Sequence, residues 1–134
     1  MHGLHLTADL RGCDAQQAPM HDAEALRALC LAQVAAAGLR AVDSLFHRFT
    51  LAEGQTGPAG VTGVVLLAES HLALHTWPEL GAVTLDVYVC NLGVDNTAAA
   101  EALMQALVHA FAPTQIERHR LDRGHPQPQA ALFR

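Results

Sequence analysis

The stretch from residue 64 to residue 79 reads VVLLAESHLALHTWPE. Its first part is an unbroken apolar run that is rich in β-branched residues and preceded by glycines, a pattern that predicts a buried strand over 61–69. A carboxylate, a hydroxyl, two imidazoles and the only tryptophan follow within a dozen positions. We therefore expect a strand edge or turn at 68–79 that carries these groups out of the core.

The rest of the chain alternates between two kinds of hydrophobic pattern. Alternation of apolar and polar residues predicts strands over 4–10, 82–90 and 114–121, and helical spacing predicts helices over 21–37 and 95–111. The segment 39–50, rich in β-formers and ending in 45–49, predicts a further strand. With the strand at 61–69, this order indicates an α+β fold. We expect a two-layer sandwich in which an antiparallel sheet is covered on one face by two helices.

The predicted strand 82–90 has two distinct faces. Its odd-numbered positions from Val83 to Val89 are apolar, whereas Thr84, Asp86, Tyr88 and Cys90 share the other face. Cys90 is therefore expected on the more polar face of the sheet.

Composition limits the classes of function. The 134 residues predict a single domain, 1–134, with a loose tail at 124–134. The formal net charge of -5 argues against binding to nucleic acid. No apolar stretch is long enough to span a membrane, and the first residues lack the pattern of a signal peptide, so we expect a cytoplasmic protein without a membrane partner.

All eight basic residues are arginines, so the chain contains no lysine. Enzymes that hold pyridoxal phosphate or a carbonyl substrate as a Schiff base use a lysine amine for that purpose. If this protein performs amine or carbonyl chemistry, its electron sink has to come from another group.

Metal binding and serine hydrolysis are weaker interpretations of the same residues. An extended segment separates His71 and His75 by about 13 Å, too far to share one ion. The three cysteines have no zinc-type spacing, so we expect no metal site. Ser70 and His75 could serve a hydrolase, but the Gly-x-Ser-x-Gly elbow is missing.

The central stretch, together with residues on either side of it, resembles a known family. The resemblance is to the short bacterial and archaeal type of pyruvoyl-dependent S-adenosylmethionine decarboxylase, and it extends from Leu4 to about Arg118. The residues that carry it are Glu69-Ser70-His71, His75-Thr76-Trp77-Pro78-Glu79, Gly81, Asp86, Cys90, Phe46-His47-Arg48-Phe49 and, more loosely, Cys13-Asp14.

This resemblance implies that the protein makes its own cofactor. Ser70 would attack the carbonyl of Glu69, and the chain would split between 69 and 70, leaving a pyruvoyl group derived from Ser70. That carbonyl would form a Schiff base with the amine of S-adenosylmethionine and accept the electrons released with carbon dioxide. The product would be the aminopropyl donor for spermidine synthesis, and the family implies a homodimer of processed protomers.

The family's other roles transfer to matching positions of this chain. His75 matches the proton acceptor in self-processing, and Cys90 matches the proton donor in catalysis. Phe49, Trp77 and Glu79 match positions that bind the nucleoside.

The chain departs from the family pattern at three positions. Thr62 stands where a serine usually assists processing, Asn91 replaces a glycine, and Ala82 replaces a residue that is often aromatic. Two alternatives therefore stay open. One is a pyruvoyl-dependent arginine or ornithine decarboxylase, and the other is an unprocessed, non-catalytic homologue that binds a nucleoside.

Overall fold

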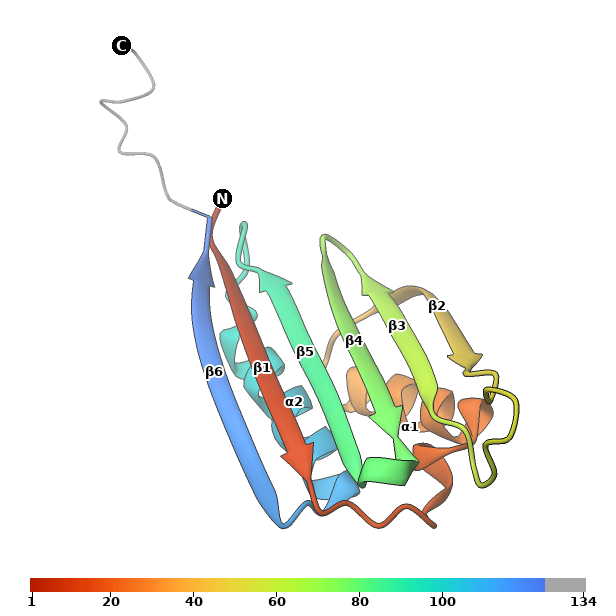
Figure 1. The fold of residues 1–134 in the computed structure, drawn as a ribbon. Helices are drawn as coiled ribbons and strands as arrows, with labels where there is room; N and C mark the ends of the chain where they lie inside the picture. The colour runs from red at the N-terminus through yellow and green to blue at the C-terminus, as the bar shows by residue number, and fades with distance from the viewer. Residues whose placement is uncertain (125–134) are drawn as a thin grey trace.

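A computed structural model describes residues 1–124, so residues 125–134 of the expected tail lie outside the description. Six strands form one antiparallel sheet in the order β2-β3-β4-β5-β1-β6, and both helices pack on the same face of it (Figure 1). The predicted α+β sandwich is confirmed. Its elements are β1 (Gly3–Arg11), η1 (Ala18–Met20), α1 (Ala23–Ala36), β2 (Ala41–Arg48), β3 (Val61–Leu67), β4 (Ser70–Trp77), η2 (Pro78–Leu80), β5 (Ala82–Cys90), α2 (Thr97–Phe111) and β6 (Gln115–Arg123).

The sheet has one strand more than the five that we predicted. Residues 70–77, expected as a strand edge or turn, form the full strand β4 between β3 and β5. Leu72 and Leu74 alternate into the core, which is the period of a half-buried strand. The preceding strand also ends earlier than predicted, at Leu67, because a two-residue turn follows it directly.

The core lies between the sheet and the two helices. Side chains from α1, α2 and the inward positions of β1, β3, β4 and β5 fill it, including Leu26, Leu72, Leu103 and Phe111. Cys30 on α1 is fully buried there, as expected, and this burial raises the pKa of its thiol to about 12. Within residues 1–124, no helix combines the length and the hydropathy that crossing a membrane requires.

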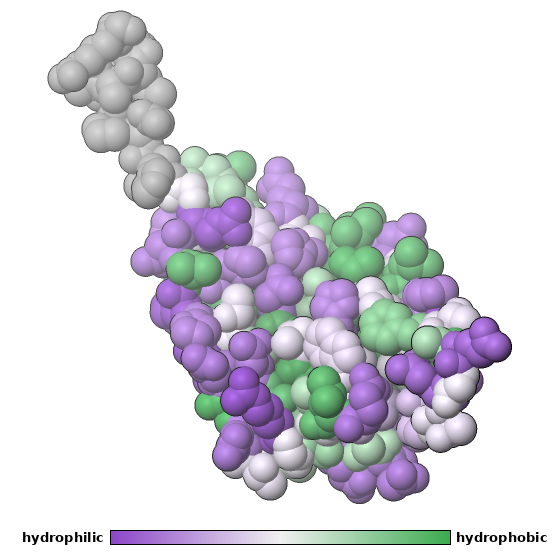
Figure 2. Space-filling view, viewed as in Figure 1, coloured by the Kyte–Doolittle hydropathy of each residue, from purple (hydrophilic) through white to green (hydrophobic). Residues whose placement is uncertain are grey.

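The other face of the sheet, here called the open face, is not covered by any element of residues 1–124 (Figure 1). Alternate residues of the central strands point toward it, and most of them are half-buried polar or aromatic side chains. Polar and apolar groups are mixed across this surface (Figure 2). The functional residues expected from the sequence lie along this face and at its edges.

Candidate active site

The turn between β3 and β4 contains the bond at which cleavage is expected. Leu67 pairs with Ser70, so Ala68 and Glu69 form a two-residue hairpin turn. Glu69 has a φ of 57°, in the left-handed region that a side chain with a Cβ disfavours. The residue before Ser70 is therefore strained, and it is also exposed to solvent.

Ser70 and Cys90 lie side by side at this end of the sheet. The backbone N–H of Cys90 donates to Ser70 Oγ at 3.0 Å. Because the hydroxyl oxygen accepts this bond, its own proton remains available to a base. Cys90 is on an interior strand, and only 7% of it is exposed, so it is more buried than its place on the polar face suggested. We call Glu69, Ser70 and Cys90 the turn end.

Asn91, the residue that replaces the family glycine, holds the loop that follows Cys90. Its side-chain oxygen accepts from the backbone N–H of Asn96 at 2.8 Å, and its amide donates to Thr97 Oγ1 at 3.2 Å. Asn96 in turn donates to the Cys90 carbonyl at 2.9 Å. The substitution therefore connects Cys90 to the start of α2.

Thr62 and His75 are cross-strand partners on β3 and β4. Thr62 Oγ1 lies 3.0 Å from His75 Nδ1, so the hydroxyl of this threonine reaches the imidazole despite its extra methyl group. The ring of Trp77 lies 5.9 Å from that of His75. Thr76, between these two residues, is buried. Its hydroxyl accepts a hydrogen bond from the backbone N–H of Val61 and donates one to the carbonyl of Met20, which fixes this end of β4.

A cavity of about 400 Å³ opens beside Trp77. Phe49 and Glu79 also line it, so the three residues expected to bind a nucleoside share one pocket. Gly60 forms part of its wall and could not be replaced easily, since a Cβ there would lie 2.0 Å from the Thr76 carbonyl oxygen. We call Phe49, Trp77 and Glu79, together with Thr62 and His75, the pocket end.

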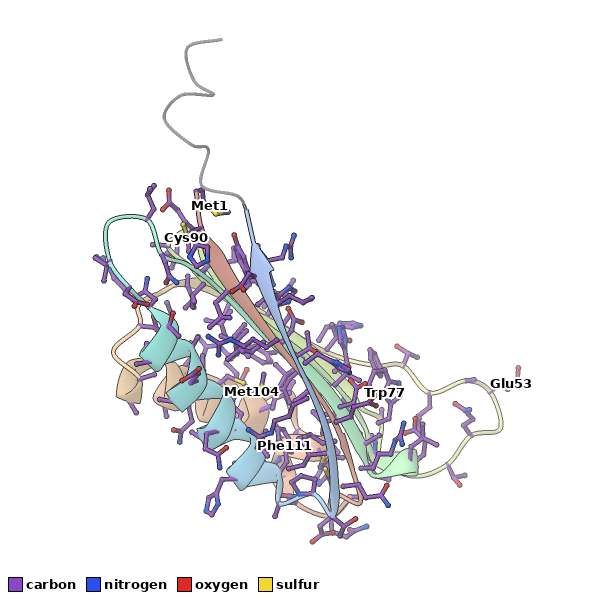
Figure 3. The ribbon with its side chains drawn as sticks, turned by 90° about the vertical axis from the view of Figure 1, so that its left-hand side faces the viewer. Met1, Glu53, Trp77, Cys90, Met104 and Phe111 are labelled. Carbon is purple, nitrogen blue, oxygen red and sulfur yellow. The ribbon has the colours of Figure 1, made fainter. Side chains whose placement is uncertain are left out.

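The structure does not bring these two groups together within one chain. Seven residue steps along β4 separate Ser70 from Trp77, which corresponds to about 23 Å. Five steps, or about 17 Å, separate Ser70 from His75. Figure 3 shows Cys90 and Trp77 toward opposite ends of the sheet. A single chain therefore keeps the turn end and the pocket end apart.

A cluster that the sequence did not reveal lies between the two ends. Asp86 on β5 contacts His5 on β1 and His71 on β4. The three side chains place their potential metal-binding atoms within 4.8 Å of one another, and within residues 1–124 no other group of three does so. Sequence reasoning paired His71 with His75 and left His5 unused. The alternating patterns of all three strands, taken with their order in the sheet, are what identify the cluster.

Comparison with known proteins shows the family of this chain. The family model described as S-adenosylmethionine decarboxylase matches residues 4–124. The chain is 38% identical over 122 residues to the S-adenosylmethionine decarboxylase proenzyme of Sulfurihydrogenibium sp., a match that covers 91% of this chain and 82% of that protein. It is 34% identical over 122 residues to the proenzyme of Archaeoglobus fulgidus, covering 91% and 97%.

A solved structure supports the same assignment. The crystal structure of the adenosylmethionine decarboxylase from Aquifex aeolicus matches with a TM-score of 0.80 and 35% sequence identity, over 95% of this chain and 94% of that one. Sequence and fold thus agree over nearly the whole length of both proteins. The chain belongs to the S-adenosylmethionine decarboxylase family.

Proposed function

We propose that this protein is a proenzyme that cleaves itself between Glu69 and Ser70 and then decarboxylates S-adenosylmethionine, giving the aminopropyl donor for spermidine synthesis. The observation that carries the proposal is a serine hydroxyl placed directly after a strained turn residue, in a chain without lysine. A pyruvoyl group made from Ser70 fits this site, and it supplies the carbonyl that accepts the electron pair released with carbon dioxide.

Self-cleavage uses groups from both the turn end and the pocket end. Ser70 Oγ attacks the carbonyl carbon of Glu69, while the N–H of Cys90 holds that oxygen in place. The imidazole of His75, hydrogen-bonded to Thr62, takes up the proton. Breaking the peptide bond also releases the left-handed conformation of Glu69.

Substrate binding and turnover use the same two groups. Phe49 and Trp77 offer aromatic faces to the adenine and the sulfonium cation, and Glu79 offers a carboxylate to the ribose hydroxyls. The Cys90 thiol, next to Ser70, donates the proton that replaces the lost carboxylate.

These steps need two copies of the chain. His75 lies about 17 Å from Ser70 along β4, well beyond the reach of its side chain. A two-fold dimer that packs open face against open face would bring the turn end of one protomer to the pocket end of its partner. Symmetry then gives two identical composite sites. We therefore propose a homodimer whose active sites are shared between protomers.

Mixed dimers test this proposal. Ser70→Ala and His75→Ala chains carrying different affinity tags are co-expressed, and dimers containing both tags are isolated. Each mixed dimer has one intact composite site, so its activity should be about half that of the wild type. By intact mass, only the His75→Ala chain should be cleaved. Homodimers of either variant should remain whole and inactive.

Two results would contradict different parts of the proposal. Wild-type protein that stays one chain on prolonged incubation would rule out self-cleavage. A wild type that cleaves, combined with a His75→Ala chain that stays intact in the mixed dimer, would rule out the shared site.

A further inference from the structure

The cluster around Asp86 is built by the pairing of three strands. Tyr88 is the cross-strand partner of both His5 and His71. Both imidazoles extend diagonally to Asp86, which is two residues before Tyr88 on β5. His5 Nε2 lies 2.9 Å and His71 Nε2 3.1 Å from the same oxygen, Asp86 Oδ2. About a third of the Asp86 and His71 side chains and 17% of that of His5 are exposed.

Arg123 fixes the direction of these hydrogen bonds. Its Nη1 lies 3.0 Å from His5 Nδ1, and its guanidinium also lies over the ring of Tyr88. A guanidinium can only donate, so His5 Nδ1 accepts, and the proton of that ring is on Nε2 and points at Asp86. The Nε2 of His5 then has no lone pair for a metal ion, which argues for a hydrogen-bonded chain rather than a metal site.

Cleavage would remove most of what holds residue 70. Transfer of the Glu69 carbonyl carbon from nitrogen to Ser70 Oγ breaks the peptide bond, and elimination then breaks the Cβ–Oγ bond. The oxygen leaves as part of the new Glu69 carboxylate. Hydrolysis by one water releases the nitrogen as ammonia. Residue 70 thereby loses its link to the turn, its N–H and the oxygen that accepts from Cys90.

We propose that the hydrogen bond from His71 to Asp86 is the anchor that keeps the new chain end in place after cleavage. His71 becomes the first complete residue of that chain, and ends of strands fray unless they are tied down. His5 and Arg123 hold Asp86 in position. His71 and Asp86 are thus positioning residues for the group at position 70, and this role rests on the function proposed above.

Hydrogen exchange in cleaved and uncleaved protein tests the anchor. Asp86→Ala is introduced into the wild type and into the Ser70→Ala background, which keeps the turn intact. In the cleaved protein, the amides of residues 71–74 should exchange about tenfold faster than without the substitution, since a hydrogen bond to a charged group is lost. In the Ser70→Ala background they should change little. The kcat of cleaved Asp86→Ala should fall more than its KM rises.

Two further variants and one control make the test specific. His71→Leu removes the same hydrogen bond and should reproduce the effect, and combining it with Asp86→Ala should add nothing. It also serves in place of Asp86→Ala if that protein does not fold. The control is Asp122→Asn on β6, which removes an exposed carboxylate that lies 3.9 Å from the imidazole of His2. It should leave exchange and kcat unchanged.

The intact mass of the wild type distinguishes failure of the anchor from failure of the proposed function. If the wild type does not cleave, the proposed function fails. Given a wild type that cleaves, equal acceleration of exchange in both backgrounds would overturn the proposal, since it would indicate general destabilisation. Unchanged exchange in the cleaved protein would overturn it as well. So would stoichiometric binding of Zn²⁺ that Asp86→Ala abolishes, because His5 would then present a lone pair at Nε2.

Discussion

The turn end and the pocket end of the sheet are built in different ways. At the turn end, backbone groups define the site: Glu69 has a left-handed conformation, and the N–H of Cys90 donates to Ser70 Oγ. At the pocket end, side chains from neighbouring strands define the site, through the bond between Thr62 and His75 and the cavity beside Trp77.

This difference separates the bond that we propose is cleaved from the groups that we propose bind the substrate and take up a proton. The turn end offers a strained backbone and a thiol, and its residues do not line the cavity beside Trp77. The pocket end offers a cavity and an imidazole but no bond to be cleaved. Substitutions at the two ends should therefore change different measurements.

The largest effect is expected at Thr62. Thr62→Val keeps the shape of the side chain and removes the hydroxyl that bonds His75. Because proton transfer at a positioned group contributes at least about a hundredfold, self-cleavage should slow by about that factor. The rate is measured by the appearance of the two chains in denaturing mass spectra.

Thr62→Ser is the matched control for this substitution. It keeps the hydroxyl and frees its rotation, so the cleavage rate should stay within about threefold of the wild type. A Thr62→Val protein that cleaves at the wild-type rate would show that the Thr62 hydroxyl has no part in cleavage.

A smaller effect is expected at Trp77. Trp77→Ala removes an aromatic face from the pocket, and losing one stacked base should raise KM by about tenfold or more. Cleavage should proceed at the wild-type rate, because the bond between Thr62 and His75 remains. Steady-state kinetics of the cleaved protein measure the effect.

Leu80→Ala, five residues from His75 in chain order and three from Trp77, is a suitable control, since 69% of that leucine is exposed. It should change neither KM nor cleavage. If Trp77→Ala blocked cleavage and left KM unchanged, the assignment of substrate binding to the pocket end would be wrong.

Local patterns predicted the layers of this fold because periodicity is a property of neighbouring residues. The apolar run before Glu69 and the alternation in 82–90 led to the strands, and the stripes of the two helices led to the covered face. The motif from Glu69 to Glu79 predicted part of each end, and the family resemblance added Thr62, Phe49 and Cys90. The extended part of the motif was predicted as a strand edge or turn and forms the full strand β4, because the polar residues Ser70, His71 and His75 interrupt the apolar pattern.

Long-range pairing was beyond the reach of the same patterns. His5, Asp86 and Arg123 meet only because β1 lies between β5 and β6 in the sheet, and that order is not encoded in any short stretch. The separation of Ser70 from His75 could be predicted in part, because the extended segment expected at 71–75 already keeps its two histidines apart. The full distance follows only when β4 is a continuous strand, since a turn at Ser70 would bring the two residues closer.

The smallest effect is expected from relieving the strain at the turn end. Glu69→Gly removes the Cβ that disfavours a φ of 57°, so the uncleaved chain should become more stable by about 1 kcal/mol. If this strain is released as the peptide bond breaks, its absence should slow self-cleavage by up to about fivefold.

The molecule provides its own control for this prediction. Ala112, at the end of α2, is the other non-glycine residue with a positive φ within residues 1–124, at 45°. Ala112→Gly should give a similar gain in unfolding free energy, measured by denaturant titration of the uncleaved protein, without changing the cleavage rate. Equal cleavage rates in the two variants would mean that the strain at Glu69 shapes the hairpin and does not drive the reaction. A slower rate in Glu69→Gly alone would assign the strain to the bond that is broken.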